Sequence, residues 1–248
     1  VSSPANVLAE PSAGASLAAR RQKIEILKTI LEARRDVAGY AALCEEGGGL
    51  EPEDCEKLAE MCVTRRRPEE ALAWVDRGLG LESGGAERGR RFHRPSRRLQ
   101  PLRRNLLKQL DRSEEALASA WEAYQQSPAT YTYEELMKFV ARDDRAAWHE
   151  KAMAVLESAS LSSRIELFLK TKEWQRLAEL IEATPRKRLV EISHYQSEPA
   201  AKKLKKRHPL LAAKLFVAMA LRILDARKSK YYDAALANLE QARAIMQK

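Results

Sequence analysis

The fold of this chain is decided by the stretch from Glu53 to Leu81, which reads EDCEKLAEMCVTRRRPEEALAWVDRGLGL. Its first half has apolar residues at positions i, i+3, i+4 and i+7, which share one face of a helix: Cys55, Leu58, Ala59 and Cys62. Three arginines, 65–67, come next, where positive charge favours a helix C-terminus. Pro68 suits the first position of a second helix, because the N–H that it lacks would have no helical partner there. The stretch therefore predicts a helical hairpin with a short basic turn.

The second helix of this hairpin has two small residues seven positions apart, Ala71 and Gly78, with Val75 between them. Small residues at this spacing let two helix backbones approach closely. A single hairpin of this length cannot bury its apolar face alone, so the sequence predicts neighbouring hairpins that stack on it.

This pattern resembles the tetratricopeptide repeat. That family has apolar residues along its first helix at the positions of Cys55, Leu58, Ala59 and Cys62, and small, bulky and small residues along its second helix at those of Ala71, Val75 and Gly78. The resemblance implies an all-α fold, a right-handed superhelix of irregular tetratricopeptide-like helical hairpins, or α-solenoid. Repeats of this kind bind many unrelated partners, so the fold by itself implies no particular function.

Helical periodicity predicts five further hairpins and no strand, with at least about half of the residues helical against the usual third. The expected helices cover 17–35 and 37–44, 99–110 and 113–126, 133–140 and 145–157, 162–170 and 173–183, and 209–228 and 232–247. Arg176 stands where the repeat pattern calls for a small residue. In the last helix, the apolar positions predict an inward face: Ala235, Leu239, Ala242 and Met246. Residues 185–207 are less regular and rich in Lys and Arg.

The expected domain organisation is a disordered lead-in over residues 1–16 and a single α-helical repeat domain over 17–248. The lead-in is rich in Ser, Ala and Pro, and Gly84, Gly85, Gly89 and Pro95 predict a basic loop at about 82–98 within the domain. The chain begins at Val1 rather than Met, which is typical of a fragment or of a processed protein.

Three stretches of the chain, DVAGY (36–40), EEAL (69–72) and HPLLA (208–212), together resemble the helical region of bacterial proteins that carry SWIM-type zinc fingers, and of a related uncharacterised bacterial family. The resemblance covers roughly residues 20 to 247. The zinc finger itself needs closely spaced Cys-x-Cys and Cys-x-His pairs, and this chain has neither. The resemblance therefore implies no zinc-binding or DNA-binding role of that finger.

The net charge of +9 comes from one segment. Nine basic residues and no acidic one lie between Arg88 and Lys108, and removing them from the 44 basic residues leaves 35, which equals the 35 acidic residues. Eight of the nine are candidates for binding nucleic acid or another polyanion: Arg88, Arg90, Arg91, Arg94, Arg97, Arg98, Arg103 and Arg104. The alternative is a solvated loop, which is favoured because Phe92 is the only aromatic residue in the segment and bases are usually held by stacking as well as charge.

No pattern in the sequence indicates a catalytic residue, a metal site or a cofactor. Cys55 and Cys62 are seven apart with Cys44 nearby, whereas structural zinc ligands come as Cys-x2–4-Cys pairs, so we expect these thiols to pack in the core. The four histidines are scattered, and neither a nucleophile elbow nor a glycine-rich loop after a strand is present. The four tryptophans lie at helical core or inter-repeat spacing, and packing is expected for all of them: Trp74, Trp121, Trp148 and Trp174.

The expected function is a protein-interaction scaffold that holds an unknown protein partner on the concave surface or edge of the superhelix. The alternative is a nucleic-acid-binding helical-repeat module that uses the Arg-rich segment 88–108, with 202–207 as a second basic stretch. Three irregularly spaced cysteines predict no disulfide framework, which favours a reducing, cytoplasmic setting. No apolar run approaches 18 residues, so we expect no membrane-spanning segment.

Overall fold

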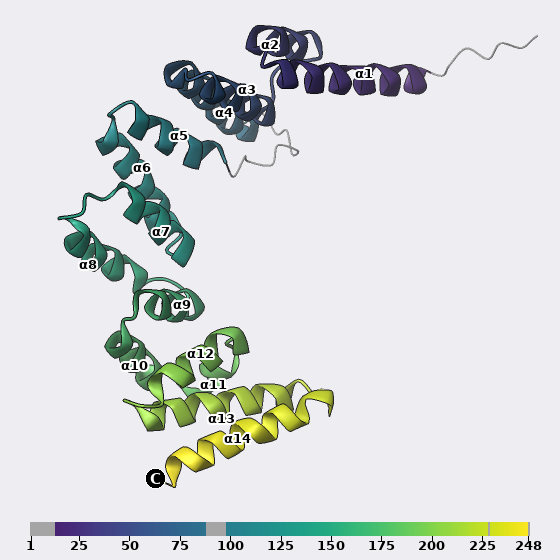
Figure 1. Ribbon diagram of the computed structural model, residues 1–248. Helices are drawn as coiled ribbons and strands as arrows, with labels where there is room; N and C mark the ends of the chain where they lie inside the picture. Colours follow the sequence, from purple (N-terminus) through teal and green to yellow (C-terminus); the bar gives the residue numbers. More distant parts are fainter. Residues whose placement is uncertain (1–12, 88–97, 228, 248) are drawn as a thin grey trace, which may run out of the picture. The chain divides into compact units, whose positions relative to one another are not determined.

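The computed structural model describes residues 13–87, 98–227 and 229–247 of the chain (Figure 1). Helix makes up 81% of these described residues, which contain no strand, and this confirms the predicted all-α class. The helix contacts divide the chain into two compact units, residues 1–119 and 120–248, and the division falls within helix α6. The prediction of one continuous repeat domain stays a prediction.

The helices up to the division are α1 (Ala13–Arg34), α2 (Val37–Glu46), α3 (Pro52–Thr64), α4 (Pro68–Glu87), α5 (Leu99–Gln109) and α6 (Ser113–Gln126). Those that follow are α7 (Thr130–Phe139), α8 (Arg145–Leu156), α9 (Leu161–Thr171), α10 (Trp174–Ala183), α11 (Arg186–Val190), α12 (His194–Leu204), α13 (Pro209–Asp225) and α14 (Tyr232–Met246), with a short 3-10 turn, η1, over Ser229–Tyr231.

The hairpin predicted from residues 53–81 is formed by α3 and α4. All four apolar residues of the predicted α3 face are fully buried: Cys55, Leu58, Ala59 and Cys62. On α4, Ala71 and Val75 are also fully buried. A Cβ atom added at Gly78 would lie 2.9 Å from the Cβ of Cys55 and 2.9 Å from Cδ1 of Leu99. The small residue therefore lets α4 approach both α3 and α5, as its spacing predicted.

Because α3 and α5 approach α4 closely at Gly78 and not at Gly80, we expect opposite effects when these two glycines are replaced by alanine. Gly78→Ala should destabilise the protein by about 1–3 kcal/mol, because the new methyl group overlaps Cys55 and overpacks the contact. Gly80→Ala should stabilise it by about 0.5–1 kcal/mol, because a Cβ atom added at Gly80 would meet no neighbouring group within 4 Å and alanine is the better helix former. Urea unfolding followed by circular dichroism measures both changes. If the two variants shifted stability in the same direction, the close approach at Gly78 would not be what requires the glycine.

A buried carboxylate joins the first three helices. Asp54, near the start of α3, accepts hydrogen bonds from Nζ of Lys28 on α1 (2.8 Å), from the hydroxyl of Tyr40 on α2 (3.0 Å) and from the backbone N–H of Glu51 (3.1 Å). Tyr40 itself lies in the apolar cluster that includes Leu58 and Met61. The network therefore fixes α1 and α2 against the N-terminal end of α3.

Two features differ from the sequence predictions at the N-terminal side of the chain. The expected lead-in over 1–16 overlaps α1, which begins at Ala13; residues 1–12 lie outside the described residues. The expected basic loop at about 82–98 overlaps α4, which continues through Gly84 and Gly85 to Glu87. Each glycine costs a helix about 1 kcal/mol relative to alanine, but adding residues to an existing helix avoids the cost of nucleation. Residues 88–97 of the expected loop are not described.

A further difference lies in the stretch 185–207, which the structure resolves into α11 and α12. Helix α12 contains Pro199, the kind of residue that argues against a helix interior. Its other face buries Ala200, Ala201 and Leu204, and α12 packs against α13 and α9. Burial of this apolar face outweighs the missing hydrogen bond. Within the described ranges, no helix is both long and apolar enough to cross a membrane.

Candidate protein-binding groove

A groove of about 780 Å³ lies between four short helices of the second unit, α8, α9, α10 and α11. Three buried apolar side chains form its inner wall: Met153, Phe168 and Leu180. Three acidic and three basic side chains line the rest: Glu150, Glu157, Glu179, Arg164, Arg176 and Arg188. This mixture of an apolar wall and balanced charges suits a polypeptide segment better than a uniformly charged ligand, since binding surfaces combine a desolvated centre with a polar rim.

One wall of the groove is held by a chain of polar contacts. Arg176 on α10 donates from Nη2 to Oε2 of Glu150 on α8 (2.6 Å), and its Nε lies 3.7 Å from Oε2 of Glu173. The arginine therefore joins α8 to α10. Arg176 is the residue that departed from the small-residue pattern, and the structure shows why: the position faces the groove and not a close helix contact.

The series of polar contacts continues away from the groove, from Glu173 to His149. Its Nε2 lies 3.0 Å from Oε1 of Glu173, and its Nδ1 lies 2.8 Å from the hydroxyl of Tyr133 on α7. Burial, followed by the charge of Glu173, raises the pKa of Tyr133, which keeps this phenol protonated. With Nε2 donating and Nδ1 accepting, both ring nitrogens contact protein groups. This arrangement orients α7, α8 and α10 relative to one another.

Among the described residues that line the groove, Arg164 on α9 has a buried polar atom without a hydrogen-bond partner. Its Nε atom is buried without a hydrogen-bond partner, and its side chain lines the groove. A buried donor without an acceptor costs about 1–3 kcal/mol, and more when it is charged. A ligand carboxylate in the groove would supply the opposite charge to the Arg164 guanidinium.

The eight arginines predicted to bind a polyanion do not form one site in the part of the chain that is described. Arg88, Arg90, Arg91, Arg94 and Arg97 lie outside the described residues. Of the other three, Arg98 lies 3.5 Å from Glu56, and Nε of Arg103 donates to Oδ1 of Asp76 at 2.7 Å. Arg104 is only 4% exposed. Two of these guanidinium groups therefore neutralise acids of the first unit, and the third lies in its interior, away from a phosphate backbone.

The cysteines are buried, as predicted, whereas the tryptophans are buried only in part. Cys44, Cys55 and Cys62 are buried free thiols, and burial raises the pKa of Cys44 and of Cys55 to about 11, which keeps both protonated at neutral pH. No group of three potential metal ligands occurs among the described residues.

The four tryptophans are only half-buried. Trp121 and Trp148 contact edge to face at 5.4 Å, with Nζ of Lys151 within 4.5 Å of both ring centres.

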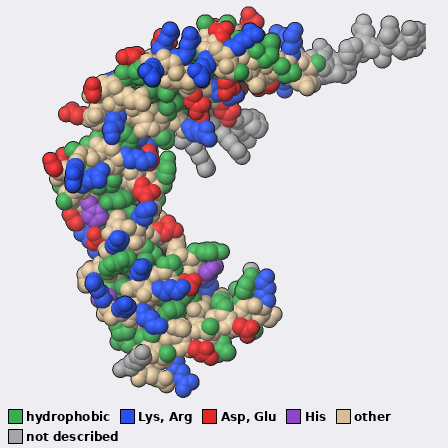
Figure 2. All heavy atoms as spheres, in the orientation of Figure 1, with side chains coloured by type: hydrophobic (Ala, Val, Ile, Leu, Met, Phe, Trp, Pro, Cys, Tyr) green, Lys and Arg blue, Asp and Glu red, His purple; other side chains and the backbone are tan. Residues whose placement is uncertain are grey.

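Acidic and basic side chains are intermixed on the drawn face of each unit (Figure 2), which agrees with the balanced charge outside segment 88–108. Together, these features define an all-helical protein with a groove of about 780 Å³ among the helices of its second unit. The sequence matches, over residues 5–248, the family described as a family of unknown function (DUF6880), and the chain belongs to it. No curated protein matches the sequence. The resemblances to tetratricopeptide repeats and to SWIM-associated helical regions stay predictions.

Proposed function

We propose that this protein is a protein-interaction scaffold of helical-repeat type, built as a tetratricopeptide-like α-solenoid, whose second unit binds a polypeptide segment in the groove between α8 and α11. Consecutive helical hairpins such as α3–α4 and α13–α14 support the interpretation of the fold as a series of helical repeats. The observation that carries the binding role is the groove itself, with a buried apolar wall beside Arg164, whose buried Nε lacks an acceptor among the described residues. Three buried free thiols support a reducing, cytoplasmic setting.

The chemistry of the groove specifies the kind of segment that fits. A Glu or Asp side chain of the partner would meet Arg164, and its apolar neighbours would contact Met153, Phe168 and Leu180. The groove acids Glu157 and Glu179 disfavour a segment with several consecutive acidic residues, because like charges would then face each other. We therefore expect a ligand with a single carboxylate among apolar residues.

A peptide selection tests this proposal. A displayed library of random peptides is panned on the 248-residue protein, and the enriched peptides are expected to contain one Asp or Glu flanked by apolar residues. Arg164→Gln should weaken their binding roughly 10- to 100-fold, the value of a charge-assisted hydrogen bond. The same change should leave the melting temperature unchanged or slightly higher, because it removes a buried donor that is unsatisfied in the free protein. Arg186→Gln, on the exposed surface of α11 and outside the groove, is the matched control.

Two results would contradict the proposal. One is enrichment of peptides whose binding is equally strong to wild type, Arg164→Gln and Arg186→Gln, since the groove would then not be the binding site. The other is tight binding of single-stranded oligonucleotides at ~150 mM salt that is lost when Arg88, Arg90, Arg91, Arg94, Arg97 and Arg98 are all changed to Gln. That result would favour the nucleic-acid-binding alternative, with a log–log salt slope near −4 for about six phosphate contacts on a single strand.

A further inference from the structure

Helix α14 carries a stripe of exposed apolar side chains that no described residue covers. Tyr232 is 43% exposed, Leu236 58%, Leu239 40% and Met246 59%. Their spacing, with Arg243 included, is four, three, four and three residues, so all five lie along one helix face. The face that packs on α13 is a different one, which buries Ala235, Ala242 and Ile245. A continuous exposed apolar stripe marks an interaction site, whereas single exposed apolar residues do not.

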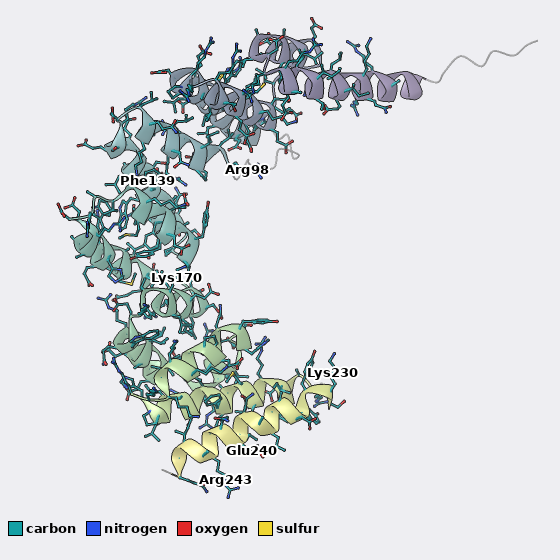
Figure 3. All side chains as sticks on the ribbon, in the orientation of Figure 1. Arg98, Phe139, Lys170, Lys230, Glu240 and Arg243 are labelled. Carbon is teal, nitrogen blue, oxygen red and sulfur yellow. The ribbon has the colours of Figure 1, made fainter. Side chains whose placement is uncertain are left out.

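The charged residues of this helix are arranged unevenly along it. Asp233 lies in its first turn and Arg243 in its last turn. Figure 3 shows Lys230, in the 3-10 turn η1 that precedes α14, and Arg243, in the last turn of α14, with Glu240 between them. Neither Asp233 nor Arg243 takes part in an ion pair within the described ranges. Both charges therefore remain available to a partner that approaches the stripe.

A second copy of the same helix complements this stripe when the two helices run antiparallel. With the two-fold axis between residues 237 and 238, Leu236 of one copy faces Leu239 of the other, and this contact occurs twice. The same register brings Arg243 to Tyr232 of the other copy, where a guanidinium over an aromatic ring is favourable. Asp233, the next residue, then lies beside the same Arg243. Arg243 thus meets Tyr232 and Asp233 of the other copy while the leucines pair at the centre.

A parallel arrangement has no such complementarity. It would bring Arg243 to its own counterpart and Asp233 to its own counterpart, and like charges across an interface are unfavourable. We therefore propose that α14 is a self-association face, through which two copies of this chain pair antiparallel about a two-fold axis. A 15-residue helix is about 22 Å long, so the buried area falls at the low end of specific interfaces. A dissociation constant on the order of 10 µM is expected.

Sedimentation velocity of the 248-residue protein, at concentrations from about 1 to 200 µM, measures this association. Wild type should shift from monomer to dimer across the range. Leu236→Asp should weaken the dimer at least ~10-fold, since it buries a charge at the apolar centre, and should leave the helical circular dichroism unchanged because Leu236 is exposed. Tyr195→Asp, an equally disruptive change at an exposed aromatic residue of α12, should leave the dimer intact.

A charge exchange tests the register. Arg243→Glu alone should weaken the dimer by removing its contact with Tyr232 and opposing Asp233 of the other copy. Asp233→Arg alone should also weaken it, because Arg then faces Arg. The double variant with both changes should recover an affinity closer to wild type than either single variant. A wild-type protein that remains monomeric at every concentration would overturn the proposal, because a different partner would then cover the stripe. The proposal would also be overturned if Leu236→Asp left the dissociation constant of the dimer unchanged. The same holds if the double variant bound no more tightly than the single variants.

Discussion

Replacing Asp54 with alanine is expected to lower the unfolding free energy by about 3–5 kcal/mol, the usual cost of removing one partner of a buried ion pair. Asp54 is 6% exposed and accepts three hydrogen bonds, from Lys28, Tyr40 and the N–H of Glu51. Without the carboxylate, the ammonium group of Lys28 is left largely buried and the hydroxyl of Tyr40 has no acceptor. Urea unfolding monitored by circular dichroism measures the loss.

A matched control separates this buried pair from ion pairing in general. Lys57 and Glu32 join the same two helices, α3 and α1, at 3.3 Å, but both side chains are well exposed. Lys57→Ala should therefore cost less than about 1 kcal/mol. If Asp54→Ala cost no more than Lys57→Ala, the buried network would not be what holds α1 and α2 onto α3.

The same carboxylate predicts a pH dependence. Burial alone would raise the pKa of Asp54, but the hydrogen bonds from Lys28, Glu51 and Tyr40 and the charge of Lys28 outweigh it, so the pKa lies below its usual 3.8. A carboxyl group with a lowered folded-state pKa stabilises the protein above about pH 4, and this contribution is lost as the pH falls through the folded-state value. The difference in stability between wild type and Asp54→Ala should thus be constant from about pH 5 to 8 and shrink below about pH 4. A difference that grew on acidification would contradict this sign.

Replacing Lys214 with methionine is expected to cost about 2–4 kcal/mol, because one ammonium group serves three backbone carbonyls. Nζ of Lys214, on α13, donates to the oxygens of Ile181 (2.8 Å), Glu182 (3.0 Å) and Thr184 (2.8 Å). These oxygens lie at the C-terminal end of α10, where unsatisfied carbonyls and the negative end of the helix dipole favour a cation. Methionine keeps the apolar stem and removes only the charge and its hydrogen bonds.

Lys205→Met is the control for this prediction. Nζ of Lys205 makes a single exposed hydrogen bond, to Oε1 of Gln241 at 3.0 Å, so its loss should cost less than about 1 kcal/mol. Lys214→Arg should recover part of the lost stability, since the guanidinium keeps the charge but not the compact geometry of three donors on one atom. Equal losses for Lys214→Met and Lys205→Met would show that the end of α10 does not depend on this cation.

Lys28 and Lys214 make contacts that the linear sequence does not reveal. Lys28 precedes Asp54 by 26 residues, and Lys214 follows Ile181 by 33. In the sequence each lysine is one of many charged residues on an amphipathic helix, and nothing in its local pattern distinguishes it. Arg176 was the exception, because it departed from a small-residue position. That departure was the one local signal that pointed to the groove.

The sequence by itself determined most of the helices and one close contact between them. Helical hydrogen bonds join residues four positions apart, so periodicity, Pro68 and the basic turn were enough to locate α3 and α4, and residues 113–126 were predicted with the bounds that α6 has. The small residue Gly78 was identified in the same way, because close packing of two helices leaves a local compositional signal.

Only the tertiary structure decided which apolar residues are covered and where polar groups meet. Leu239 and Met246 were predicted to face inward and are exposed, because α13 packs on the face that contains Ala242 and Ile245. Helix α12 forms despite Pro199 because its apolar face is buried by other helices. The groove and the unsatisfied Nε of Arg164 depend on four helices from different parts of the chain. These features result from burial against distant segments, and local periodicity carries no information about which segments those are.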